Sequence, residues 1–151
     1  MEINAFTKAA LTAVLVNNDF HYMHLLAIGE DFDKSHNLCE EYYTKIEDEV
    51  DYLMELSLEV HAPIVNYTLA GQVLSGYPVE SQSEYYYTDI IEHLQNKVSI
   101  YLLALKELRN ATADESIQSK IDDMIRDWEK ELNYRLSRRA GEQHHLTNFI
   151  I

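Results

Sequence analysis

Four long stretches of this sequence place apolar residues three and four positions apart, and this spacing constrains the fold more than any other feature. Long helices need few turns, and the 151 residues contain only 4 Gly and 2 Pro. Such a composition disfavours sandwiches and barrels. The stretches run over about 4–28, about 33–61, from 81 or 83 to 109, and from 112 or 113 to 139. We therefore expect an all-α protein built as a four-helix bundle.

The connections between the expected helices differ in length. Gly29 can take the left-handed conformation that ends a helix, so a tight turn joins the first two helices. Pro63 follows the second helix, and the link over residues 62–80 is longer. Its apolar piece from Ile64 to Leu74 predicts a short connecting helix between the second and third long helices. A single crossover at this place is the arrangement of the ferritin-like bundle.

The chain length fits one domain with one hydrophobic core, spanning residues 1–151. Its C-terminal tail, residues 140–151, ends in Phe149, Ile150 and Ile151. These side chains are too apolar for a fully solvated tail. We expect them to dock on the domain or on a neighbouring subunit.

The charge balance bounds the possible partners. The formal net charge of −14 repels nucleic acid and attracts cations, although acidity alone can also serve only solubility. The one cysteine, Cys39, forms no internal disulfide and fits a reducing compartment. The first residues lack a basic start followed by an apolar run, and no apolar stretch approaches the roughly 20 residues that span a bilayer. We expect a soluble cytoplasmic protein without a membrane or DNA partner.

The second predicted helix carries a stripe of possible metal ligands. Each residue of an α-helix advances by about 100°, so Glu40, Asp51 and Glu55 lie at about 40°, 60° and 100° from His36. All four therefore share one face of the helix. A charged stripe of this kind is often only a solvated face, and spacing alone leaves that reading open.

The length of the helix separates these residues into two groups. His36 and Glu55 lie 19 positions apart, which is roughly 28 Å along a helix, whereas metal–ligand bonds are about 2 Å long. One helix therefore cannot close them around one ion. Two antiparallel copies, related by a two-fold axis near Lys45 and Ile46, would bring His36 and Glu40 of one chain opposite Asp51 and Glu55 of the other.

The first predicted helix offers a further ligand. The turn at Gly29 folds it back along the second helix, so that His24 can reach the level of His36. Two imidazoles with carboxylates suit Fe(II), with Zn or Mn as competitors. For His21 two readings stay open, a packed residue or a partner that supports the ligands. We interpret His61 and His93 as structural, because neither has an acidic partner at helical spacing.

These residues and their spacing resemble the Dps family, the mini-ferritins named as DNA-binding proteins from starved cells. The similarity extends over most of residues 11–136. The family pattern is matched by His21, His24, Gly29, Phe32, His36, Glu40, Asp51 and Glu55. The sequence departs from it at Leu25, where a Trp commonly follows the first ligand, and at Leu56, where an Arg is common.

The resemblance implies an iron-storage protein that acts as a ferroxidase, an oxidoreductase whose substrate is Fe(II). Its subunits would form two-fold dimers and then a hollow dodecamer of tetrahedral symmetry. Fe(II) would be oxidised at the dimer interfaces, typically by hydrogen peroxide, and stored inside as ferric mineral, which limits oxidative damage. The resemblance assigns His24, His36 and Glu40 to one subunit, and Asp51 and Glu55 to the other.

Two other functions remain open at the level of the sequence. One is a non-catalytic cage or nucleoid-associated, DNA-protecting protein whose site is vestigial or filled with zinc. The other is a di-iron carboxylate protein with its site inside one subunit, which needs two Glu-x-x-His motifs. The one match to that motif, Glu142 to His145, lies in the tail. The tyrosines near the expected ligands, Tyr22, Tyr42, Tyr43 and Tyr52, either pack at an interface or accept oxidising equivalents.

Overall fold

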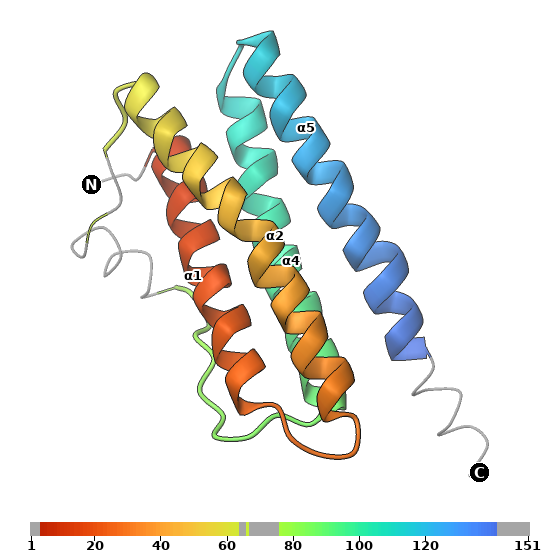
Figure 1. Cartoon of the computed structure of the whole chain (residues 1–151). Coiled ribbons are helices and arrows are strands. Elements are labelled where there is room, and N and C mark those ends of the chain that lie inside the picture. The colour runs from red at the N-terminus through yellow and green to blue at the C-terminus, as the bar shows by residue number, and fades with distance from the viewer. Residues whose placement is uncertain (1–3, 64–65, 67–75, 142–151) are drawn as a thin grey trace.

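The described part of the chain is a bundle of four long helices (Figure 1). The computed structural model describes residues 4–63, 66 and 76–141. Its helices are α1 (Ala5–Leu26), α2 (Phe32–Glu59), α4 (Tyr87–Ala111) and α5 (Glu115–Lys130), which continues into the π-helix η1 (Glu131–Leu136) and a last helical turn. No strand occurs among the described residues. The predicted all-α four-helix bundle is thus confirmed.

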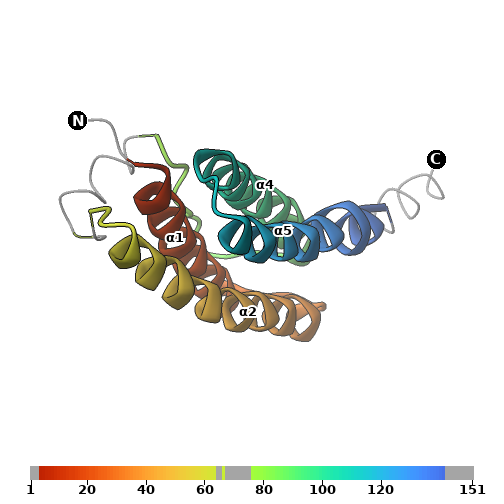
Figure 2. The ribbon, with the colours of Figure 1, turned by 90° about the horizontal axis from the view of Figure 1, so that it is seen from above.

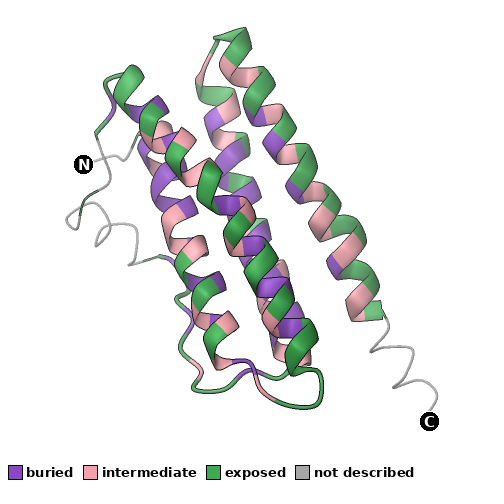
Figure 3. Cartoon of the chain, viewed as in Figure 1, coloured by how far each residue is buried: buried purple, intermediate pink, exposed green. Residues whose placement is uncertain are grey.

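The helices form two pairs that pack face to face. Viewed from above, α1 lies beside α2 and α4 lies beside α5, and α1 also packs on α4 (Figure 2). Buried positions run along the facing sides of the helices, whereas exposed positions cover their outer sides (Figure 3). The largest fully buried side chains include Trp128, Tyr42, Tyr101 and Phe20. Each such side chain contributes roughly 1.5–3 kcal/mol through its removal from water.

The helix boundaries follow from local hydrogen bonding. Asn4 caps α1 by accepting from the Phe6 amide at 2.8 Å, and Asp114 caps α5 by accepting from the amides of Ser116 and Ile117. Asp31, rather than the expected Asp33, precedes the first residue of α2. The fourth helix begins at Glu115, two or three positions later than expected, because Asp114 is its cap.

The predicted start of the third long helix was wrong. The helix begins at Tyr87 and not after Ser81 or Ser83. The residues before it run in an extended course alongside the end of α1, where Tyr85 exchanges two backbone hydrogen bonds of 2.9 Å with Leu26 and Ile28. This long-range pairing holds the segment out of the helix.

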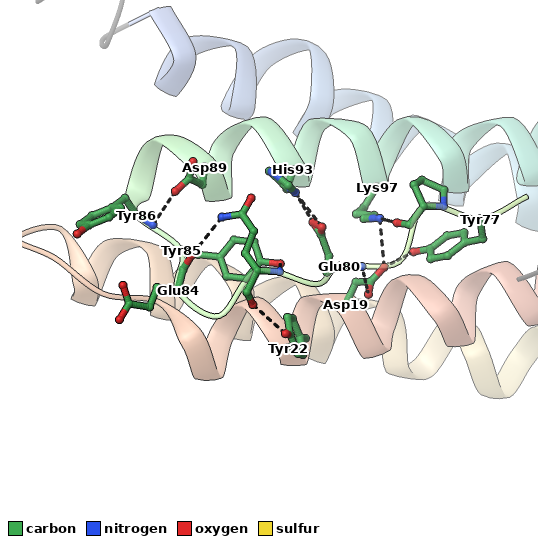
Figure 4. Close-up of polar contacts among 12 residues, drawn as sticks. Asp19, Tyr22, Tyr77, Glu80, Glu84, Tyr85, Tyr86, Asp89, His93 and Lys97 are labelled. Atoms are coloured by element: carbon green, nitrogen blue, oxygen red, sulfur yellow. Dashed lines mark hydrogen bonds and ion pairs between the residues drawn. The ribbon is translucent and has the colours of Figure 1, made fainter.

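We call residues 76–86 the strap, since they run along the bundle between α1 and α4 (Figure 4). A buried ion pair joins the two helices that flank the strap: Lys97 of α4 lies 3.3 Å from Asp19 of α1. Asp19 accepts from the Tyr77 hydroxyl, and Lys97 donates to the carbonyl of Pro78.

Some predictions fall on parts of the chain that the structure does not describe. The connecting helix from Ile64 to Leu74 lies almost entirely outside the described residues, as do positions 142–151 of the tail. Residues 140 and 141, with which the tail was expected to begin, still belong to the last helix. No described helix is both long enough and apolar enough to cross a membrane.

Candidate metal centre

Two histidines and one glutamate meet where α1 turns back into α2. Each of His24, His36 and Glu40 offers a ligand atom, and these atoms all lie within 4.8 Å of one another. Among the described residues this is the one such cluster of three or more His, Cys, Asp or Glu side chains. His24 and His36 are half-buried and Glu40 is exposed, so the cluster lies at the surface of the isolated subunit.

The turn that creates the cluster depends on Gly29. Its φ of +101° lies in the region that L-residues avoid, and a Cβ there would lie 3.0 Å from Cδ1 of Tyr86. Glycine thus allows α1 and α2 to reverse direction within five residues, 27–31. The last turn of α1 and the first turns of α2 then lie side by side, as the spacing of His24 and His36 predicted.

Reciprocal hydrogen bonds orient the two imidazoles. Nδ1 of His24 lies 2.9 Å from the carbonyl oxygen of His36, and Nδ1 of His36 lies 2.9 Å from the carbonyl oxygen of His24. A carbonyl only accepts, so each Nδ1 must carry the proton and donate it. In the neutral imidazole each Nε2 then keeps the lone pair that a metal ion requires. Second hydrogen bonds of this kind typically orient histidine ligands.

Aromatic rings support the same orientation. The two imidazoles stack with their centres 3.6 Å apart, and Phe32 stacks on His36 at 4.9 Å. Tyr43 meets His24 edge-on at 5.3 Å. Both ligand rings are therefore held by packing as well as by hydrogen bonds, which limits the reorganisation that metal binding would require.

His21 lies beside the cluster but does not join it. Its ring stacks on Tyr43 with centres 3.7 Å apart, and Tyr43 also contacts His24. Burial and then repulsion from His24 lower the pKa of His21, while Glu47 opposes the change. The sequence left two readings open for His21, a packed residue or a partner that supports the ligands. The structure shows packing, because His21 contacts Tyr43, and Tyr43 in turn contacts the ligand His24.

Asp51 and Glu55 lie elsewhere on α2. Both are exposed, and neither belongs to the cluster of His24, His36 and Glu40. This separation agrees with the roughly 28 Å that helix rise gives between positions 36 and 55. Their role opposite a second subunit stays a prediction.

The two histidines interpreted as structural occupy quite different places. His61 is exposed in the turn after α2, with a φ of +59°. His93 of α4 lies beside the strap, where its Nδ1 contacts the carboxylate of Glu80, 2.8 Å from Oε2. Sequence reasoning missed this partner because the strap, and not the helix of His93, supplies it.

Comparison with known proteins gives the class of the fold. No protein-family model and no curated protein matches this sequence. Solved structures do match: antigen TpF1 of Treponema pallidum is 18% identical, with 90% of this chain and 88% of that chain covered and a TM-score of 0.80. The Dps protein of Bacillus brevis is 20% identical, with 89% and 91% covered and a TM-score of 0.76.

A third match names the wider class. The Dps protein of Vibrio cholerae O1, described as a member of a broad superfamily of ferritin-like diiron-carboxylate proteins, is 21% identical, with 89% and 86% covered and a TM-score of 0.77. The chain is therefore a ferritin-like four-helix bundle. Within that class it has the fold of Dps proteins, which confirms the resemblance at the level of structure.

Proposed function

We propose that this protein is a ferroxidase of the mini-ferritin type, which oxidises Fe(II) at sites shared between two subunits. The observation that carries the proposal is the cluster of His24, His36 and Glu40, whose two imidazoles are held with Nε2 available. Asp51 and Glu55 on the same helix are spaced to complete a second copy of this cluster across a two-fold axis.

The donor set suits iron as the substrate. Imidazole nitrogen and carboxylate oxygen are ligands that Fe(II) accepts, and zinc and manganese would compete for them. Three donors from one chain leave room for the two acidic residues of a partner. An open depression of about 550 Å³ beside Glu40, lined also by Asn37, Glu41, Thr44 and Lys45, offers space for that approach. The net charge of −14 favours the arrival of cations.

The role of the chain's own residues is to bind and orient the metal ion. Oxidation of two Fe(II) ions supplies the two electrons that reduce one hydrogen peroxide to two waters, with two protons taken from solvent. Because both electrons come from iron, no hydroxyl radical is released. We further propose that two-fold dimers assemble into a hollow dodecamer that stores the ferric product and so protects against oxidative damage.

DNA is not a partner in this proposal. Two arginines near the end of the last helix are already engaged: Arg135 lies 2.6 Å from Glu41, and Arg139 donates to the Tyr87 hydroxyl at 3.2 Å. The acidity of the chain also opposes phosphate.

Subunit complementation tests the shared site. One variant lacks the histidine half (His36→Ala with Glu40→Ala), and the other lacks the acidic half (Asp51→Ala with Glu55→Ala). Each alone should oxidise anaerobic Fe(II) with peroxide much more slowly than wild type, as followed by ferric absorbance. When the two are assembled together, each mixed dimer regains one intact site, so activity should reappear.

The control is Asp123→Ala, which removes an exposed carboxylate of α5 far from the cluster in sequence and should leave the rate unchanged. Mixtures no more active than the sum of their parents would exclude a shared site. Tight zinc binding without any Fe(II) oxidation in wild type would favour the non-catalytic, zinc-filled cage.

A further inference from the structure

The strap ends against the turn that brings the metal ligands together. The Tyr85 amide donates to the carbonyl of Leu26, and the Ile28 amide donates to the carbonyl of Tyr85, both at 2.9 Å. The last carbonyls of a helix have no partner within the helix. The strap supplies such a partner at the end of α1, only two residues after the ligand His24.

The strap also contacts the turn at Gly29. A Cβ added there would lie 3.0 and 3.4 Å from two carbons of the Tyr86 ring, so this ring packs on the turn. The Tyr86 amide donates to the carboxylate of Asp89 at 3.0 Å, which fixes this end of the strap to the first turn of α4. The strap therefore contacts the stretch of chain that separates His24 from His36 at two places.

The position of Tyr85 depends on both helices that flank the strap (Figure 4). Its side chain is fully buried, and its ring meets the rings of Tyr22 and His93 edge-on, with centres 6.0 and 5.6 Å apart. Its hydroxyl accepts from the Gln82 amide at 3.1 Å, while the Tyr22 hydroxyl donates to the Gln82 carbonyl at 2.8 Å. Tyr85 is thus held between α1 and α4.

His93 attaches the middle of the strap to α4. The Glu80 side chain is only 5% exposed, and its carboxylate contacts Nδ1 of His93 through both oxygens. A carboxylate accepts, so the imidazole donates. Because a buried carboxylate without such a partner is costly, this contact opposes release of the strap. The same imidazole packs against Tyr85, so His93 holds the strap at two points.

We propose that the strap positions the metal centre, with His93, Glu80 and Tyr85 as positioning residues that act through the ligands and do not touch the metal ion. This inference rests on the proposed function and concerns the same site. The strap fixes the end of α1 and the turn, so that the two ligand imidazoles are in place before a metal ion arrives. When the strap is released, metal binding must also order the turn, which weakens it.

The first test measures zinc binding by calorimetry. His93→Leu removes the donor to Glu80 and should weaken zinc binding about tenfold, the lower end of what is lost when a residue that orients a metal ligand is changed. His93→Asn places an amide donor near the position of Nδ1 and should bind zinc nearly as tightly as wild type. Equal affinity of wild type and His93→Leu overturns the inference, as does an equal loss in His93→Asn.

A matched control separates positioning from general loss of stability. Leu108 is fully buried in α4, 15 positions after His93, which is roughly 22 Å along the helix. Leu108→Ala opens a cavity in the core and destabilises the bundle. At a temperature where circular dichroism shows each variant folded, it should bind zinc as wild type does. A loss of affinity equal to that of His93→Leu overturns the inference.

The second test uses the reciprocity of coupled equilibria. If a fixed strap strengthens zinc binding, bound zinc must stabilise the fixed strap by the same factor. Saturating zinc should therefore slow hydrogen exchange of the Tyr85 amide in wild type about tenfold, although zinc binds on α1 and α2. His24→Ala should not show this effect. Unchanged exchange in wild type, or slowing that persists in His24→Ala, overturns the inference.

These measurements distinguish the inference from the proposed function, because zinc binding involves no redox step. Wild type that binds zinc but oxidises no Fe(II) with peroxide overturns the ferroxidase and leaves the positioning role of the strap intact. Fe(II) oxidation by wild type together with equal zinc affinity in His93→Leu overturns only the positioning role. Wild type that binds no zinc and oxidises no Fe(II) overturns both.

Discussion

The buried ion pair between the helices that flank the strap allows a specific prediction about stability. Lys97 and Asp19 have side-chain exposures of 3% and 2% and lie 3.3 Å apart. The change Lys97→Met keeps most of the side-chain volume but leaves the Asp19 carboxylate buried without its cation. Removal of one partner from a buried pair costs about 3–5 kcal/mol, and we expect a loss of that size. The carbonyl of Pro78 loses its donor as well.

A second substitution should recover part of this loss. Asp19→Asn removes the negative charge yet can still accept the hydroxyl of Tyr77, which donates to Asp19 in the wild type. The double variant Asp19→Asn with Lys97→Met therefore contains no unpaired charge. We expect it to be more stable than Lys97→Met alone by about 2 kcal/mol, because a neutral hydrogen-bonded group costs less to bury than an uncompensated charge.

Urea unfolding, followed by circular dichroism at one fixed protein concentration, gives these free energies, since an oligomer's stability depends on concentration. The control is the surface pair of Lys106 and Glu129, which lie a similar 3.2 Å apart but have side-chain exposures of 52% and 39%. Lys106→Met should cost less than about 1 kcal/mol. Equal losses for Lys97→Met and Lys106→Met would refute the reasoning, because burial would then make no difference.

Three further predictions concern the metal centre and the core. Gly29→Ala forces an L-residue to a φ of +101° at a cost of about 1–2 kcal/mol, and it should weaken zinc binding measured by calorimetry. The control Gly141→Ala, which has open space around the added Cβ, should leave zinc binding unchanged. Zinc at 100 times its dissociation constant should stabilise the wild type by about 2.7 kcal/mol, and His24→Ala should abolish most of the rise in unfolding temperature. Burial raises the pKa of Glu49 above its ordinary value of 4.5, although the hydrogen bonds from Trp128 and Tyr101 lower it in part. The folded protein therefore holds this proton more tightly than the unfolded chain does. Stability conferred by Glu49 should therefore fall as pH rises from 4.5 through the raised pKa, and urea unfolding of Glu49→Gln should lack this part of the fall.

The sequence was sufficient to predict the elements that depend on local pattern. Helical periodicity located all four long helices, and the reversal at Gly29 placed His24 beside His36. Both results depend on neighbours in sequence, where spacing and turn chemistry act directly. The same reasoning separated Asp51 and Glu55 from the cluster, because helix rise is a fixed quantity.

Features that depend on distant contacts were not predictable in this way. The third helix starts late because Tyr85 bonds to the backbone at the end of α1, a partner that no local pattern announces. The Glu80 partner of His93 was missed for the same reason. The reciprocal bonds between the imidazoles and the two carbonyls required the backbones of α1 and α2 to lie at hydrogen-bond distance, which only the packed structure reveals.

The middle of α2 connects the proposed metal site with the core of the bundle. The predicted two-fold axis passes near Lys45 and Ile46, between the histidine half of the site at one end of α2 and the acidic half at the other. On the inner side of this same stretch, Lys45 lies over Trp128 and Glu49 accepts its indole hydrogen. One helix would thus present both halves of the metal site outward and the charged partners of Trp128 inward. Glu49→Gln disturbs only this inner side, so it should change the pH dependence of stability while leaving zinc binding, measured by calorimetry, unchanged.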